Sequence, residues 1–237
     1  MNHYIIDGRY KELLKFFSID IEAVLKKARL PEDIFNHKII KLKEVEYYRF
    51  LTAIGDISKE PDLPIQMATS SQIESFSPPI FASYCSKNGL ICIERLSKYK
   101  KLIGPMSMIR KIEDNSVTVK FQAGEDGLEL PSFLVQSEFA FLIGIIRKAT
   151  QLEIKPKTII MKELPLSEEL SLFTGVKPIN CWPKNSPTCA LSPTIGPAWA
   201  PATPTRAPAP SPTWLTTSTP LSTRLSPARF SSSATAG

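Results

Sequence analysis

The sequence predicts an α+β domain with a helical N-terminal half, a strand–strand–helix–strand unit after it, and a disordered C-terminal tail. Up to residue 103 the apolar residues recur with the spacing of amphipathic helices, whereas from residue 107 they alternate as in half-buried strands. After residue 175 the composition changes and the helical periodicity ends. We therefore expect one domain over residues 1–175 and a low-complexity tail over residues 176–237.

Amphipathic helices dominate the first sixty residues. Residues 10–17 predict a short helix, after which Ser18 is expected to cap the next one, with Asp20 and Glu22 in its first turn. A further helix is expected over residues 44–57, which prolines follow. The apolar stripes of the second and third helices consist of Ile21, Val24, Leu25 and Ala28, and of Tyr47, Phe50, Leu51, Ile54 and Ile57.

Shorter segments complete the helical half. Residues 31–35 predict a short turn, and residues 65–71 and 79–85 predict helices. Residues 90–103 predict a longer helix, which Gly104-Pro105 ends.

The period of the pattern changes after Gly104. Residues 107–112 and 117–121 predict two strands joined by a turn at Asp114-Asn115, because apolar and polar residues alternate in the second of them. Residues 131–149 are apolar on almost every side and predict a central helix. Residues 157–162 predict a final strand.

Charge and composition divide the chain near residue 178. Residues 1–178 contain 25 Lys and Arg and all 23 Asp and Glu, whereas residues 179–237 contain four basic residues and no acid. Pro, Ser, Thr and Ala make up 39 of these last 59 residues, and frequent prolines prevent helices and central strands. Because most of the net charge of +6 comes from the tail, it does not indicate a nucleic-acid-binding domain.

Several classes of protein are not expected. The two histidines, His3 and His37, have no nucleophile in a suitable context, and no glycine-rich phosphate loop is present, so we expect no catalytic residues and no cofactor. The four cysteines form no CxxC pair, and we expect Cys85 and Cys92 to be free thiols rather than metal ligands. Neither a secretory signal nor a membrane-spanning stretch is evident, which predicts a cytoplasmic protein.

A ligand pocket is one interpretation of residues 73–81, IESFSPPIF. Stiff proline turns beside aromatic residues often form the wall of a cavity, with a polar group such as Glu74 or Arg95 to orient the ligand. A helix–helix connection with aromatic residues in the core is the alternative. The basic residues of the following helix have two interpretations as well, a solvated face or a nucleic-acid surface, and we favour the solvated face for Arg95, Lys98, Lys100 and Lys101.

The same region carries a resemblance to a known family. Residues 73–105 contain a predicted helix that ends in the pattern R-L-x-x-Y-x-x-L-I, and ARLPEDIF and VEYYRFLTAIG precede them. LPSFLVQSEFAFLIGIIRKAT and KPKTIIM follow them. With this spacing, the chain over roughly residues 15–175 resembles the N-terminal effector-sensing domain of AraC-type transcription regulators, called "arabinose-binding".

The resemblance implies a small-molecule effector, a homodimer, and contact with DNA through a C-terminal domain with two helix-turn-helix units. Nothing over residues 179–237 has the pattern of such units, so no DNA-binding residue is expected in this chain. The ligand-binding residues are predicted from the segment most typical of the family and are Phe76, Phe81, Cys85 and Arg95.

The tail itself suggests how the second domain was lost. Codons for Pro, Thr, Ala and most Ser residues share C at the second position, so we interpret the tail as the product of a frameshift near codons 175–180. A genuine Pro-rich linker is the alternative, although three tryptophans, Trp182, Trp199 and Trp214, are unusual in a linker. The other functional possibilities are a stand-alone small-molecule-binding module and a Pro-rich interaction protein.

Overall fold

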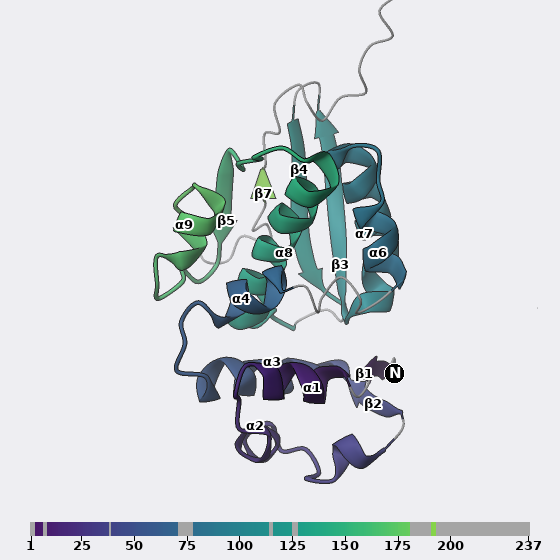
Figure 1. Ribbon diagram of the computed structural model, residues 1–237, viewed down its shortest axis with the longest axis vertical. Helices are drawn as coiled ribbons and strands as arrows, with labels where there is room; N and C mark the ends of the chain where they lie inside the picture. The colour runs from purple at the N-terminus through teal and green to yellow at the C-terminus, as the bar shows by residue number, and fades with distance from the viewer. Residues whose placement is uncertain are drawn as a thin grey trace, which may run out of the picture. The chain divides into compact units, whose positions relative to one another are not determined.

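The computed structural model describes residues 3–6, 9–37, 39–70, 78–113, 116–124, 128–180 and 191–192 (Figure 1). Backbone contacts divide the chain into Met1–Thr203 and Pro204–Gly237, and every described residue belongs to the first unit. The chain combines helices and strands, so the α+β fold class is confirmed, and the predicted elements occur in the predicted order with further short ones before, between and after them. The predicted tail lies outside the described residues from 181 onward, apart from residues 191–192.

Two short strands flank the first helices. β1 (His3–Ile6) and β2 (Ile40–Lys43) pair antiparallel, and α1 (Arg9–Phe16), α2 (Ile21–Ala28) and a 3-10 turn (Ile34–Asn36) lie between them in the chain. α3 (Glu44–Ile57) begins directly after β2. The sequence pattern predicts α3 but neither strand, because four residues are too few to establish an alternation.

The N-terminus of α2 corrects one prediction. Asp20 is the N-cap rather than Ser18: its carboxylate accepts a hydrogen bond of 3.1 Å from the backbone nitrogen of Ala23. Ser18 lies in the turn after α1 with a φ of 54°. A carboxylate satisfies an unpaired N–H and is favoured at the positive end of the helix dipole, which explains why Asp20 takes this position.

The other helices lie close to their predicted positions. They are α4 (Leu63–Thr69), α6 (Pro78–Tyr84), α7 (Gly89–Ile103) and α8 (Ser132–Thr150). The side chain of Asn88 caps α7 by accepting a hydrogen bond of 2.9 Å from the backbone nitrogen of Ile91. α9 (Glu169–Thr174) is an addition that the sequence pattern did not predict.

Five strands form the larger sheet, in the order β3-β4-β7-β5-β6. Their bounds are Met106–Glu113, Ser116–Ala123, Leu191–Ser192, Thr158–Met161 and Ile179–Asn180. β3 and β4 pair antiparallel, with Met108 opposite Phe121, which confirms the predicted pair of strands. The predicted turn at Asp114-Asn115 lies outside the described residues.

α8 is the central helix, as predicted. It packs against α3, α4, α6, α7 and α9, and Figure 1 shows it running beside β4. The ring of Phe139 on α8 lies 5.7 Å from that of Phe121 on β4. In the part of the chain that the structure describes, neither α8 nor another helix is long and apolar enough to span a bilayer.

A buried carboxylate connects α3 to the sheet. Glu44, only 2% exposed, accepts hydrogen bonds of 2.7 Å from the Tyr48 hydroxyl and 2.8 Å from the backbone nitrogen of Gly124. A Cβ atom on Gly124 would lie 2.8 Å from Glu44 Oε2, so a side chain at this position would displace the carboxylate. Burial, together with the nearby Glu44, raises the pKa of Tyr48 and keeps its hydroxyl neutral.

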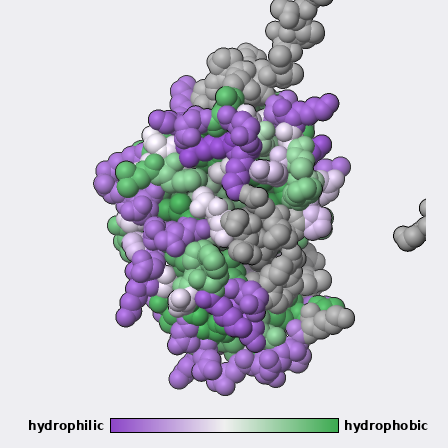
Figure 2. Space-filling model, viewed as in Figure 1, coloured by the Kyte–Doolittle hydropathy of each residue, from purple (hydrophilic) through white to green (hydrophobic). Residues whose placement is uncertain are grey.

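Hydrophilic residues cover much of the face shown in Figure 2, with smaller hydrophobic areas between them. Beneath this surface the apolar side chains of α3, α4, α7, α8 and strands β1 to β5 form one continuous core. Such a core leaves little unfilled space, so the cavities at its edge call for an explanation.

Candidate ligand-binding site

Three cavities in the described part of the chain could hold a molecule. The largest, about 720 Å³, is bordered by α3, the loop after α3, the start of α8 and the loop after β5. Two smaller ones, of about 110 and 220 Å³, lie among α1, α3, α4, α6, α7, α8 and α9. The smaller two are neighbours, because Ala68, Ile80 and Phe141 line both of them.

The largest cavity has a mixed and mostly exposed lining. Arg49 contributes a buried Nε atom that has no hydrogen-bond partner among the described residues. The lining of this cavity contains two basic residues, Arg49 and Lys59. It also contains four acidic residues, Asp56, Glu60, Glu129 and Glu163. Lys27 pairs with Asp56 and Lys162 with Glu129, so the charges around this cavity nearly balance, and its exposed loops exclude little water.

The 110 Å³ cavity differs from the largest one because a buried ion pair forms part of its wall. The Lys100 ammonium on α7 is hydrogen-bonded to Glu138 Oε2 on α8, and the two side chains are 2% and 13% exposed. Lys100 Nζ also lies 5.8 Å from the ring centroid of Phe121 and 5.7 Å from that of Phe141. Both charges are thus compensated where water is largely excluded.

Two tyrosine hydroxyls from different helices meet at the same end. Tyr10 on α1 and Tyr47 on α3 share a hydrogen bond of 3.0 Å, and both residues line the 110 Å³ cavity with Lys100 and Glu138. Burial raises the pKa of Tyr47 well above its usual value, and Tyr10 and Glu138 raise it further. The hydroxyl of Tyr47 therefore stays protonated and can act as donor and acceptor.

Apolar side chains make up most of the remaining lining. Those around the 110 Å³ cavity include Leu13, Leu51, Met67, Ile103, Phe133 and Leu134. Tyr84, Ile145 and Phe173 line the 220 Å³ cavity, together with Gly144 in the middle of α8. Mostly apolar walls with a few converging polar groups are typical of sites that bind small molecules.

Gly144 keeps the second cavity open. A Cβ atom at this position would lie 3.8 Å from Phe173 Cζ and 3.9 Å from Thr69 Cγ2, which are ordinary contact distances. Packing therefore does not require glycine here, even though glycine weakens a helix interior. The absence of a side chain instead leaves the space between α4, α8 and α9 unfilled.

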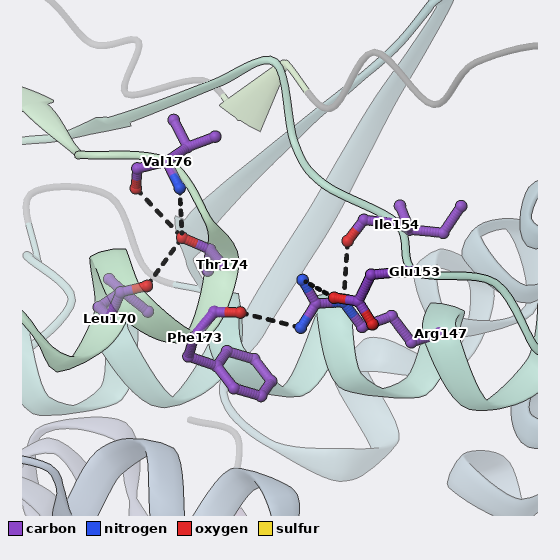
Figure 3. Close-up of polar contacts among 7 residues, drawn as sticks. All are labelled: Arg147, Glu153, Ile154, Leu170, Phe173, Thr174 and Val176. Atoms are coloured by element: carbon purple, nitrogen blue, oxygen red, sulfur yellow. Dashed lines mark hydrogen bonds and ion pairs between the residues drawn. The ribbon is translucent and has the colours of Figure 1, made fainter.

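The wall formed by α9 is held by one arginine of α8 (Figure 3). Arg147 donates hydrogen bonds of 2.8 Å to the carbonyl of Ile154 and 2.9 Å to that of Phe173, and it pairs with Glu153 at 3.0 Å. Its guanidinium also lies 5.1 Å from the ring centroid of Phe173. These contacts fix the ring of Phe173 against the 220 Å³ cavity.

Two of the residues that the sequence predicted for the site, Phe81 and Cys85, lie away from the described cavities. Phe81 is 59% exposed and Cys85 is also exposed, and neither is among the residues lining the cavities described above. Phe76 and Glu74 lie outside the described residues. The structure therefore does not bring the predicted residues together at a described cavity, and their role in binding stays a prediction.

Arg95 contacts the end of α6 rather than a cavity. Its guanidinium donates to the carbonyl of Ala82 at 2.6 Å, and more weakly to the carbonyl of Cys85 and the hydroxyl of Ser86, both at 3.3 Å. Arginine thus satisfies carbonyl groups at the C-terminal end of a helix. This contact joins α6 to α7.

Lys100 corrects the interpretation of the basic residues on α7 as a solvated face. Lys98 and Lys101 are exposed, but Lys100 is among the largest fully buried side chains. The signal was present in the sequence, because Ile93, Leu96, Lys100 and Ile103 recur at helical spacing and place Lys100 within the apolar stripe. Its partner was signalled too, since Glu138 is the one acidic residue within residues 131–149.

Metal ligands and reactive thiols do not converge in the described ranges. No group of three or more His, Cys, Asp or Glu side chains there could hold a metal ion. Cys85 and Cys92 are free thiols, as predicted. Burial raises the pKa of the Cys92 thiol to about 12, against the opposing effect of Arg95, so this thiol is unreactive at neutral pH.

The fold and the cavities together define an α+β domain with space for a small molecule beside a buried ion pair. The family model described as the arabinose-binding domain of AraC transcription regulators, N-terminal, matches residues 19–168. The chain therefore belongs to this family, and the resemblance noted in the sequence is confirmed. No curated protein matches the chain.

Proposed function

We propose that this chain is the effector-sensing regulatory domain of an AraC-type DNA-binding transcription regulator, and that it has no catalytic activity. The match over residues 19–168 supports the sensing role. The single structural observation that carries the proposal is the pair of neighbouring cavities, the smaller of which is lined by the ion pair of Lys100 and Glu138. A space of this kind costs packing energy in a core, which is reasonable where a ligand fills it.

The effector site consists of the two neighbouring cavities. Their walls come from α1, α3, α4, α6, α7, α8 and α9, so a bound molecule would touch elements from most of the domain. A ligand that contacts so many elements stabilises the arrangement to which it binds best. In a complete regulator, this preference would be passed to a DNA-binding domain.

A thermal-shift screen of the full chain against a chemically diverse panel of small molecules tests the proposal. We expect at least one molecule to raise Tm, and Gly144→Leu, which fills the 220 Å³ cavity, to abolish that shift. Lys101→Leu is the control, because Lys101 is exposed and lines no described cavity. A panel without any hit, or a hit that survives Gly144→Leu, would contradict the proposed site.

The composition of residues 179–237 supports the finer proposal that a frameshift replaced the helix-turn-helix domain. Resequencing the DNA from codon 170 to several hundred bases past codon 237, with translation in three frames, is the test. Two helix-turn-helix units in a shifted frame would support a truncated regulator. If no frame encodes them, the chain is better described as a stand-alone small-molecule-binding module.

Two partners follow from the proposal. The domain would form a homodimer, and an intact form would contact DNA through its second domain. Sedimentation of the full chain over a range of concentrations tests the first of these. A monomer at all concentrations would remove the homodimer from the proposal.

A further inference from the structure

Resting on the proposed function, we propose that the two cavities bind an uncharged, largely apolar molecule with a single hydroxyl group, of the class of monocyclic phenols and alicyclic alcohols. Four features of the site lead to this class: its charge balance, its unused acceptor capacity, its apolar second cavity and its size. The apolar second cavity also disfavours a sugar, although the family description names one.

The charge balance of the site selects a neutral ligand. Lys100 and Glu138 compensate each other, and Arg147, the arginine of the second cavity, is paired with Glu153. A charged ligand would lose its hydration in the site without gaining a counter-ion, which is strongly unfavourable. A carboxylate or ammonium ligand would have to break one of these pairs to enter.

The acceptor capacity of Glu138 selects a hydrogen-bond donor. Within the described part of the chain, its carboxylate has one hydrogen-bonding partner, the Lys100 ammonium. A carboxylate can accept several hydrogen bonds, so it can also accept one from a ligand hydroxyl. Ser137, which lines the same cavity, already donates its hydroxyl hydrogen at 2.9 Å to the carbonyl of Phe133. Tyr10 and Tyr47 already share a hydrogen bond with each other at this end, so Glu138 is the acceptor for a ligand hydroxyl.

The 220 Å³ cavity suits the apolar body of the ligand. Arg147 uses its guanidinium on Ile154, Phe173 and Glu153, and Thr69 donates its hydroxyl hydrogen to the carbonyl of Ile65 at 2.8 Å. Ser70 and Lys148 are engaged as well. A sugar carries a hydroxyl group on almost every carbon, and most of these would be buried here without a partner.

The size of the site fits one ring with a short substituent. An apolar cavity of about 150 Å³ accommodates benzene, and the two cavities here measure about 110 and 220 Å³ and share three lining residues. A ring near Phe141 could therefore direct its hydroxyl towards Glu138 and an alkyl group towards Gly144. Phe141 lines both cavities, which makes it the natural contact for the ring.

Calorimetric titration of the full chain with four probes tests the ligand class. The probes are 4-ethylphenol, its methyl ether, 4-ethylbenzoate and L-arabinose, which differ in donor, charge and number of hydroxyl groups. We expect 4-ethylphenol to bind at least about tenfold more tightly than each of the others, since a hydrogen bond to a charged group is worth that ratio. No measurable binding of 4-ethylphenol at millimolar concentration would overturn the inference.

Two variants locate the binding. In the double variant Lys100→Met/Glu138→Leu, which removes both charges, 4-ethylphenol and its methyl ether should bind within about twofold of each other. Gly144→Leu should weaken 4-ethylphenol binding at least tenfold, and Gly144→Ala is the milder substitution should the larger one fail to fold. Discrimination that survives the double variant would show that Glu138 is not the acceptor and would overturn the inference.

The two proposals fail in different ways. If L-arabinose binds more tightly than 4-ethylphenol and Gly144→Leu abolishes its binding, the effector site stands and the proposed ligand class is wrong. If 4-ethylphenol binds equally well to the wild type and to Gly144→Leu, the cavities are not the site and both proposals are wrong.

Discussion

The two halves of α8 meet their neighbours in opposite ways. In the N-terminal half, Phe133 packs so closely on α3 that a Cβ atom added to Gly55 would lie 3.0 Å from its Cδ2 atom, and Glu138 is bound to Lys100. In the C-terminal half, Gly144 faces a cavity of about 220 Å³. One helix can therefore pack tightly on α3 and hold the ion pair in its first half, while a missing side chain in its second half leaves part of the site unfilled.

The largest expected effect on stability comes from breaking the ion pair in the N-terminal half of α8. Lys100→Met leaves the Glu138 carboxylate buried without a counter-ion, which should cost about 3–5 kcal/mol of unfolding free energy. Urea unfolding measures this loss. Lys101→Met is the matched control on the next, exposed residue and should change stability by less than about 0.5 kcal/mol. Equal effects of the two substitutions would mean that the pair does not hold α7 against α8.

Gly55→Ala on α3 should reduce stability, because the new side chain would meet Phe133 in the N-terminal half of α8. The added Cβ atom would meet three side-chain atoms of Phe133 at 3.0–3.2 Å, so the ring or one of the helices must move. Such overpacking typically costs about 1–3 kcal/mol, more than alanine gains over glycine in a helix. Thermal unfolding with calorimetry is the measurement, and an unchanged or higher Tm would show that the contact between α3 and α8 is loose.

Replacing Gly144, in the C-terminal half of α8, with alanine should raise the stability rather than lower it. Gly144→Ala places a Cβ atom at ordinary contact distance from Phe173 and Thr69, so the gain in helix stability of about 0.5–1 kcal/mol should be retained. Tm should then rise by about 1–4 °C for a domain of this size. A fall in Tm at both glycines would remove the contrast between the two halves.

The smallest expected effect is a loss of stability in alkaline solution that depends on Tyr47. Burial raises the pKa of Tyr47 above its usual 10.0 in the folded protein, so the hydroxyl ionises first in the unfolded chain. The resulting stabilisation is complete below about pH 10 and is lost as the pH rises further. Between pH 10 and 11, wild type should therefore lose unfolding free energy more steeply than Tyr47→Phe. Parallel curves would indicate that water reaches this end of the site.

Long amphipathic segments made much of the fold predictable. α3 was predicted with its observed bounds because its stripe covers four turns and prolines follow it. β1, β2, β6 and β7 have two to four residues each, and their pairing depends on partners far away in the chain. α9 carried recognisable signals, acidic residues at its start and Gly175 after its end, but six residues give too little periodicity.

The candidate site was less predictable, because burial depends on the phase of a helix against its neighbours. In α6, Ile80 is buried and lines both small cavities while the adjacent Phe81 is 59% exposed, and seven residues do not fix this phase. Lys100 could have been recognised from its place in an apolar stripe. Glu138 could have been recognised too, as the one acidic residue within residues 131–149, but its pairing with Lys100, 38 residues away, depends on how α7 packs against α8.

The contacts of Arg147 give the site a thermodynamic consequence at the end of the domain. α9 has six residues, too few to be helical alone, so its docking depends on Arg147 and on the ring of Phe173. A molecule in the 220 Å³ cavity touches that ring and adds to the free energy of docking. By reciprocity, releasing α9 must lower the affinity for the molecule by the same factor. Ligand binding in the cavity and docking of α9 thus stabilise each other, and docking of α9 sets the direction in which the backbone continues after Gly175.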